Sequence, residues 1–159
     1  MSSSSKKDEN QCYTYFRIVG DFNPDEISLK LGLHPYDSWK AEDKKKFGRA
    51  YGFSAWHFGK CEVYNIVVTE QMEETIAPLL DKIELLNQIR KENDVNFYLE
   101  VVPFLSSYND NPCLAPSLKV MDFCTATRTE FDFDFYVCDW YKKSGVNFTP
   151  LSFMYYISS

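Results

Sequence analysis

The stretch that decides the fold is Gly20-Asp21-Phe22-Asn23-Pro24-Asp25-Glu26-Ile27, which continues through Leu31-Gly32-Leu33-His34-Pro35 to Trp39. Gly20 lets the backbone turn at the end of a preceding strand. Asn23 is a favoured N-cap residue, Pro24 suits the first helical position, and Glu26 completes a capping-box pattern. Gly32 marks the C-terminal stop of the helix. The stretch therefore predicts a strand, a tight entry and a short capped helix in succession.

Regular patterns extend on both sides of this stretch. Large β-forming residues fill both alternating rows of residues 12–19, which predicts a strand covered on both faces. From Thr69 to Ile89, apolar residues recur at three- and four-residue steps, which predicts an amphipathic helix. Pro78 lies too deep for a first turn, so we expect a kink or two abutting helices there. The remaining elements are expected to be strands at 51–58, 95–104 and 131–137 and a helix at 117–126.

This order predicts a single-domain α+β sandwich. We expect a four- or five-stranded, largely antiparallel sheet with helices packed on one face. The first and last thirds share their order of elements, which suggests an internal β-α-β duplication. Residues 1–10 are polar and are expected to form a flexible tail, and residues 11–159 to form the domain.

The composition limits the classes of protein to which the chain can belong. Its 159 residues, 45% hydrophobic and 17% aromatic, exclude a disordered chain. A net charge of −6 and a pI near 4.9 argue against nucleic-acid binding, which requires a basic face. The five cysteines form no Cys-x-x-Cys pair, so reduced thiols in a cytoplasm are favoured. No apolar run is long enough to cross a membrane, so we expect a soluble cytoplasmic protein.

Glu130, Asp132 and Asp134 alternate with three phenylalanines. On a strand, this pattern puts three carboxylates about 6.5–7 Å apart on one face and three phenyl rings on the other. We expect the rings in the core and the carboxylates facing outward. The carboxylates then serve solubility, docking of a basic partner, or metal or acid–base chemistry. A straight strand does not converge them on one ion, and we expect no metal and no cofactor.

Two tryptophans are candidates for an exposed binding surface. Trp39 precedes the charged segment 40–49, and Trp140 follows the acidic strand, whereas Trp56 is expected in the core. Exposed aromatic rings beside carboxylates attract Lys- and Arg-rich partners through charge steering and cation–π contact. The residues expected to form the binding surface are Trp39, Glu130, Asp132, Asp134 and Trp140.

An enzymatic reading stays open beside this one. A small hydrolase or ligand-binding enzyme would use a cleft lined by His57, Asp132 and Asp134. The sequence contains no nucleophile elbow, phosphate-binding loop, dinucleotide fingerprint or metalloprotease motif, and we assign no catalytic residue.

Residues 13–137 resemble a family of small bacterial proteins catalogued as domain of unknown function 4279. The resemblance rests on Phe16-Arg17-Ile18-Val19-Gly20-Asp21-Phe22-x-Pro24, on Leu31-Gly32-Leu33-x-Pro35-x-x-x-Trp39, and on Asp132-Phe133-Asp134-Phe135-Tyr136. The family implies no catalytic residues.

Stand-alone acidic domains of this size are suspected of being immunity proteins, which bind and block a toxin. By that analogy we expect a non-catalytic, protein-binding module whose partner is a basic protein such as a toxin. The sequence does not indicate an oligomeric state, a role for the aromatic segment 145–159 or a role for the segment 40–49.

Overall fold

The computed structural model describes residues 10–43, 48, 50–63, 67–106, 110 and 112–137. The elements in chain order are β1 (Gln11–Asp21), α1 (Pro24–Leu31), β2 (Asp37–Trp39), β3 (Ser54–Val63), α2 (Val68–Ile76), the 3-10 helix η2 (Ala77–Lys82), α3 (Ile83–Glu92), β4 (Asp94–Leu105), α4 (Leu118–Thr127), β5 (Thr129–Phe133) and β6 (Tyr136–Val137). The expected tail at 1–10, apart from Asn10, lies outside the described residues. So do Trp140, the segment 145–159, and residues 44–47 and 49 of the charged segment.

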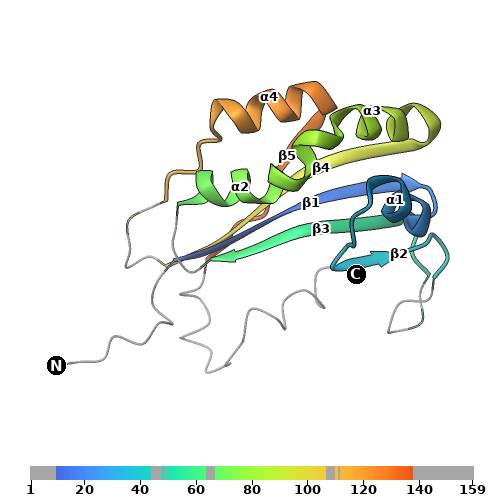
Figure 1. The fold of residues 1–159 in the computed structure, drawn as a ribbon. Coiled ribbons are helices and arrows are strands. Elements are labelled where there is room, and N and C mark those ends of the chain that lie inside the picture. The colour runs from blue at the N-terminus through green and yellow to red at the C-terminus, as the bar shows by residue number, and fades with distance from the viewer. Residues whose placement is uncertain are drawn as a thin grey trace.

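The fold is a single-domain α+β sandwich, as the sequence predicts. The strand order is β2-β3-β1-β4-β5 (Figure 1). β6 also pairs with β4. β1 runs antiparallel to both β3 and β4, whereas β5 and β6 run parallel to β4. The sheet has six strands instead of four or five, because the short strand β2 was not expected and the strand expected at 131–137 is divided into β5 and β6.

The two β-α-β units suggested by the sequence close differently. In the first unit, which contains α1, the strands β1 and β3 are antiparallel neighbours. In the second unit, which contains α4, the strands β4 and β5 are parallel neighbours. The similar order of elements in the two thirds therefore does not produce two copies of one arrangement.

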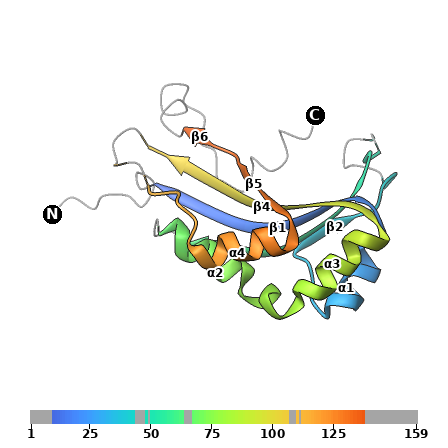
Figure 2. The same ribbon diagram turned by 90° about the horizontal axis from the view of Figure 1, so that it is seen from above.

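The helices lie together on one face of the sheet, as Figures 1 and 2 show. The core forms between this helix layer and the strands, where alternate residues of each strand point toward the helices. Phe16 of β1 contacts the rings of Phe97 and Phe123, with centroids 5.6 and 6.0 Å away. Trp56 of β3 is fully buried, which confirms its expected place in the core.

Helix α1 begins and ends as the opening stretch predicts. The Asn23 side chain accepts a hydrogen bond from Asp25 N at 3.2 Å and donates one to Glu26 at 3.2 Å. Gly32 adopts the left-handed conformation at the C-cap, with φ 64°. Trp56 Nε1 donates to Ser28 Oγ at 2.9 Å, and this bond ties the helix to β3.

Gly20 is required by the close approach of β1 to β4. Its φ is 151°, and a Cβ atom at this position would lie 2.1 Å from Asp94 O. The glycine thus allows β1 to stay paired with β4 up to Asp21, the last residue of the strand.

Pro78 interrupts the long amphipathic segment as expected. α2 ends at Ile76, η2 carries Pro78 in its first turn, and α3 begins at Ile83. The proline has no N–H to donate, so the chain passes through a 3-10 segment between two α-helices. No helix in the described part of the chain combines the length and apolar character needed to cross a membrane.

Candidate functional site

The sheet face opposite the helices carries a group of charged and titratable side chains. Odd-numbered residues of β1 point to this face, and Arg17 stands at the centre of the strand. In the register, Arg17 lies beside His57 of β3 and Tyr98 of β4, while Tyr15 lies beside Glu100. Glu100 is in turn the neighbour of Asp132 on β5. The strands therefore place a cation, a histidine and two carboxylates on one face.

Arg17, Glu100 and Asp132 form a cluster across three strands. Arg17 Nη2 lies 2.7 Å from Glu100 Oε1 and 3.4 Å from Asp132 Oδ2. The Glu100 residue is only 3% exposed, and its Oε1 accepts no hydrogen bond of regular geometry, so the contact with Arg17 is an ion pair. The guanidinium also lies over the ring of Tyr98, 4.9 Å from its centroid.

Burial raises the pKa of Glu100 to about 7. The nearby Arg17 guanidinium opposes this rise, whereas the carboxylates of Asp132 and Asp134 add to it. A carboxyl group with such a pKa exchanges its proton near neutral pH, where ordinary carboxyl groups are ionised.

His57 is enclosed by aromatic rings on the same face. The rings of Tyr15, Tyr36 and Trp39 lie 5.2, 5.9 and 4.9 Å from it, measured between centroids. The residue is 6% exposed, and neither ring nitrogen has a hydrogen-bond partner. Burial, with a smaller contribution from Arg17, lowers the pKa of His57 to about 4. The imidazole is therefore neutral at physiological pH.

Trp39 is held in place on β2 and is only partly exposed. Its ring stacks on Tyr51 at 4.5 Å, and its Nε1 donates to Phe53 O at 3.1 Å. β2 and β5 form opposite edges of the sheet, four strand spacings or about 19 Å apart. The structure thus separates Trp39 from Glu130, Asp132 and Asp134. Trp140 lies outside the described residues.

The acidic row runs along β5 and one residue past its end. Glu130 and Asp134 are exposed. Asp132 is partly exposed and forms an ion pair with Arg17. Asp134 also accepts a hydrogen bond from the Tyr136 hydroxyl at 2.7 Å.

The phenyl row differs from expectation. Phe131 packs against the core, but Phe133 and Phe135 are 37% and 53% exposed, so their expected burial is wrong. The three rings stack along the strand with centroids 6.0 and 6.1 Å apart. β5 leaves the C-terminal end of α4 and twists away from the helix layer, which leaves the later rings uncovered (Figure 1).

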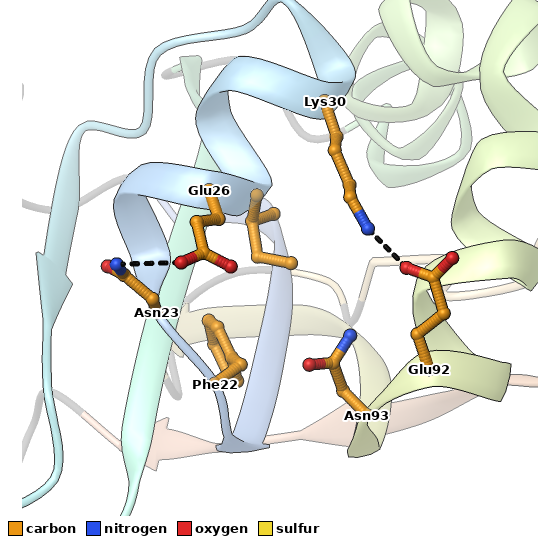
Figure 3. Close-up of a pocket in the computed structure, with 7 residues that line it drawn as sticks. Phe22, Asn23, Glu26, Lys30, Glu92 and Asn93 are labelled. Carbon is orange, nitrogen blue, oxygen red and sulfur yellow. Dashed lines mark hydrogen bonds and ion pairs between the residues drawn. The ribbon is translucent and has the colours of Figure 1, made fainter.

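The residues of the enzymatic reading stand on strands that are not neighbours in the sheet. His57 and Asp132 lie three strand spacings apart, about 14 Å along the sheet, with Arg17 between them. A small pocket lies elsewhere, between α1 and the end of α3 (Figure 3). It is lined by Phe22, Asn23, Glu26, Ile27, Lys30, Glu92 and Asn93. Lys30 of α1 and Glu92 of α3 form an ion pair beside the pocket, so the pocket lies at the contact between two helices.

The described residues contain no group of three His, Cys, Asp or Glu side chains able to hold a metal ion. The cysteines Cys12, Cys113 and Cys124 are free.

Arg17 and Glu100 are the site residues that sequence reasoning missed. A signal was present, because each is the one charged residue in the interior of its strand, among large apolar residues. Charges in such positions are normally paired.

Comparison with known proteins gives one match. The model of the family described as "Domain of unknown function (DUF4279)" matches residues 10–138. No curated protein and no solved structure matches the chain.

Proposed function

Since the chain belongs to the DUF4279 family, whose description assigns no activity, we propose its function from the geometry of the β5 edge. The protein is a non-catalytic protein-binding module of the immunity-protein type. It masks a basic surface on a partner protein, such as a toxin, in the bacterial cytoplasm.

The observation that carries the proposal is the pairing of exposed rings with exposed carboxylates at this edge. Phe133, Phe135 and Val137 are 37%, 53% and 58% exposed, and Glu130 and Asp134 are exposed beside them. Aromatic side chains, phenylalanine included, are enriched at the centre of protein interfaces. A surrounding rim of one charge selects a partner of the opposite charge and speeds its approach. We name the residues Glu130, Asp132, Phe133, Asp134, Phe135 and Val137 the acidic–aromatic edge.

The net charge of −6 supports the same reading, because it steers a basic partner toward the protein from a distance. Trp39 is not part of the acidic–aromatic edge, because β2, which carries it, forms the opposite edge of the sheet. The alternative of a small hydrolase or ligand-binding enzyme is weaker. Such an enzyme would need His57 and Asp132 to act on one substrate, but β1 and β4 lie between β3, which carries His57, and β5, which carries Asp132.

A comparison of three immobilised baits tests the proposal. The first is the wild-type protein, and the second carries Glu130→Lys with Asp134→Lys. The third is a matched control with Glu70→Lys and Glu84→Lys, two exposed residues of α2 and α3 that give the same change in charge. Lysate of the native host is passed over each bait, and retained proteins are identified by mass spectrometry.

We expect the wild type and the helix control to retain the same basic protein, and the edge variant to lose it. Elution should occur as NaCl rises from about 0.05 to about 0.3 M, because exposed charges are screened over that range. Equal retention by all three baits would contradict the proposal, as would turnover of a substrate by the purified wild type that Glu130→Lys and Asp134→Lys leave intact.

A further inference from the structure

In the described part of the chain, no strand pairs with the outer side of β5. Among the described residues β5 pairs only with β4, in the register Phe97↔Thr129 to Val101↔Phe133. Asp134 N donates to Val101 O at 3.0 Å, which fixes the even-numbered residues as those whose backbone groups face β4. In a parallel pair, alternate residues face opposite sides. Phe131 and Phe133 therefore direct their N–H and C=O groups away from the sheet.

β5 lacks the lysines, prolines and bulges with which many edge strands block strand addition. Natural edge strands are protected by lysines, prolines or bulges. β5 carries none of these over Thr129–Phe133, and its charges on the face opposite the helices are carboxylates. Carboxylates repel one another, and thus a second copy of β5, but they attract a strand that bears cations.

The side chains define what an added strand must contain. Glu130 and Asp132 stand about 6.5–7 Å apart on one face, with Asp134 continuing the row. Phe131 and Phe133 stand at the intervening positions on the other face, where their rings are stacked. Residues directly opposite on neighbouring strands contact one another. A matching strand therefore carries cations at every second position and apolar side chains between them.

We propose that the β5 edge binds an extended segment of the basic partner as an additional β-strand, with lysines or arginines opposite Glu130 and Asp132 and apolar residues opposite Phe131 and Phe133. This inference rests on the proposed function and specifies how its partner is recognised. Backbone hydrogen bonds along the edge supply affinity, and alternating side chains supply specificity.

Short acetylated peptides test the inference with the full-length protein. The first alternates lysine and valine. The second has the same composition with all lysines in one block. The third is the alternating peptide with N-methyl groups on every second residue, a change that keeps the charge but blocks pairing on one edge. Their binding is measured by isothermal titration and by the broadening of backbone amide resonances in β5.

The wild type should bind the alternating peptide at least about tenfold more tightly than the block or methylated peptide, a difference of about 1.4 kcal/mol. Phe133→Pro should abolish this preference, because proline removes an N–H that points away from β4. Phe133→Ala is the matched control, since it removes the ring and keeps the N–H; it should retain the preference. Thermal melting of both variants verifies that they fold, and the peptide comparison on the wild type does not depend on them.

Two failures separate the inference from the proposed function. In the first, the wild type binds all three peptides equally, and the variant with Glu130→Lys and Asp134→Lys binds none of them. This result would overturn strand addition and leave acidic docking intact. In the second, the wild type binds all three equally and the variant binds them as tightly, which would overturn both proposals. A lack of binding by the alternating peptide at millimolar concentration would also overturn strand addition.

Discussion

Arg17 Nη2 lies 2.7 Å from Glu100 Oε1, and this ion pair joins two strands on the sheet face opposite the helices. Glu100 is almost fully buried, so its charge depends on a partner. The same guanidinium reaches Asp132 at 3.4 Å and so connects the centre of the sheet with the acidic–aromatic edge.

Replacing Arg17 should destabilise the fold when Glu100 is ionised. At pH 8 we expect Arg17→Met to lower the free energy of unfolding by about 3 kcal/mol, because a buried carboxylate loses its counter-ion. Urea unfolding followed by tryptophan fluorescence measures the loss. Lys91→Met, at an exposed position, is the control and should change stability by no more than about 0.5 kcal/mol. A loss of similar size in both variants would refute the role of the ion pair.

Glu100 should make the protein less stable as pH rises. Its pKa is about 7 in the folded state and 4.5 ordinarily, so between these values the folded state binds more protons than the unfolded state. The contribution of Glu100 to stability is therefore lost as pH rises from 4.5 to 7, by about 2–3 kcal/mol. Glu100→Gln should remove this loss, which urea unfolding at pH 4.5 and 7 would detect. A variant whose pH profile overlays that of the wild type would contradict the assignment.

His57 should act in the opposite direction. Its pKa falls from 6.5 to about 4 on folding, so over this window the unfolded state binds more protons. Stability from this group is present above pH 6.5 and is lost as pH falls toward 4. His57→Phe preserves an aromatic ring and removes the titration. In that variant His57 no longer offsets the large shift of Glu100, so stability should decline from pH 4.5 to 7. A rise over the same range would show that His57 is not the group responsible.

Two glycines with positive φ should respond differently to substitution. Gly20→Ala forces a Cβ atom against Asp94 O, whereas a Cβ at Gly32 meets nothing within 4 Å. We expect Gly32→Ala to cost about 1 kcal/mol from backbone strain alone. Gly20→Ala should cost at least about 3 kcal/mol, because β1 and β4 must separate. Differential scanning calorimetry provides the comparison, and equal melting temperatures would disprove the close approach.

The phenyl rings of the edge should contribute little to folding. Phe135→Ala should change the free energy of unfolding by no more than about 0.5 kcal/mol, since the residue is half exposed. Phe123→Ala, in the core, should cost at least about 3 kcal/mol. If Phe135→Ala unfolds the protein as readily as Phe123→Ala, the edge is part of the core and cannot be a docking surface.

Local signals in the sequence predicted local structure well. The Asn23 cap, the Gly32 stop and the break at Pro78 each act within a few residues, so tertiary contacts had little opportunity to change them. The alternation in 12–19 likewise predicted a strand covered on both faces, although the second face is covered by aromatic and ion-paired side chains.

Features that depend on distant parts of the chain were missed. Alternation shows that Phe131, Phe133 and Phe135 share a face, but where α4 stops covering that face is a tertiary property. β2 has only three residues and exists because β3 offers it a partner. Strand order is a tertiary property too, and it puts Trp39 at the edge of the sheet opposite the carboxylates.

The central position of β1 has a consequence for biosynthesis. This strand leaves the ribosome first, yet one of its two neighbours is β4, whose pairing joins Gln11 to Phe104. Loop closure over such a separation is slow, and in the meantime β1 can be covered only by earlier elements that contact it, such as β3 and α2. Translation that stalls before Leu105 would release a chain with an unprotected apolar ribbon, a substrate for chaperones and proteases.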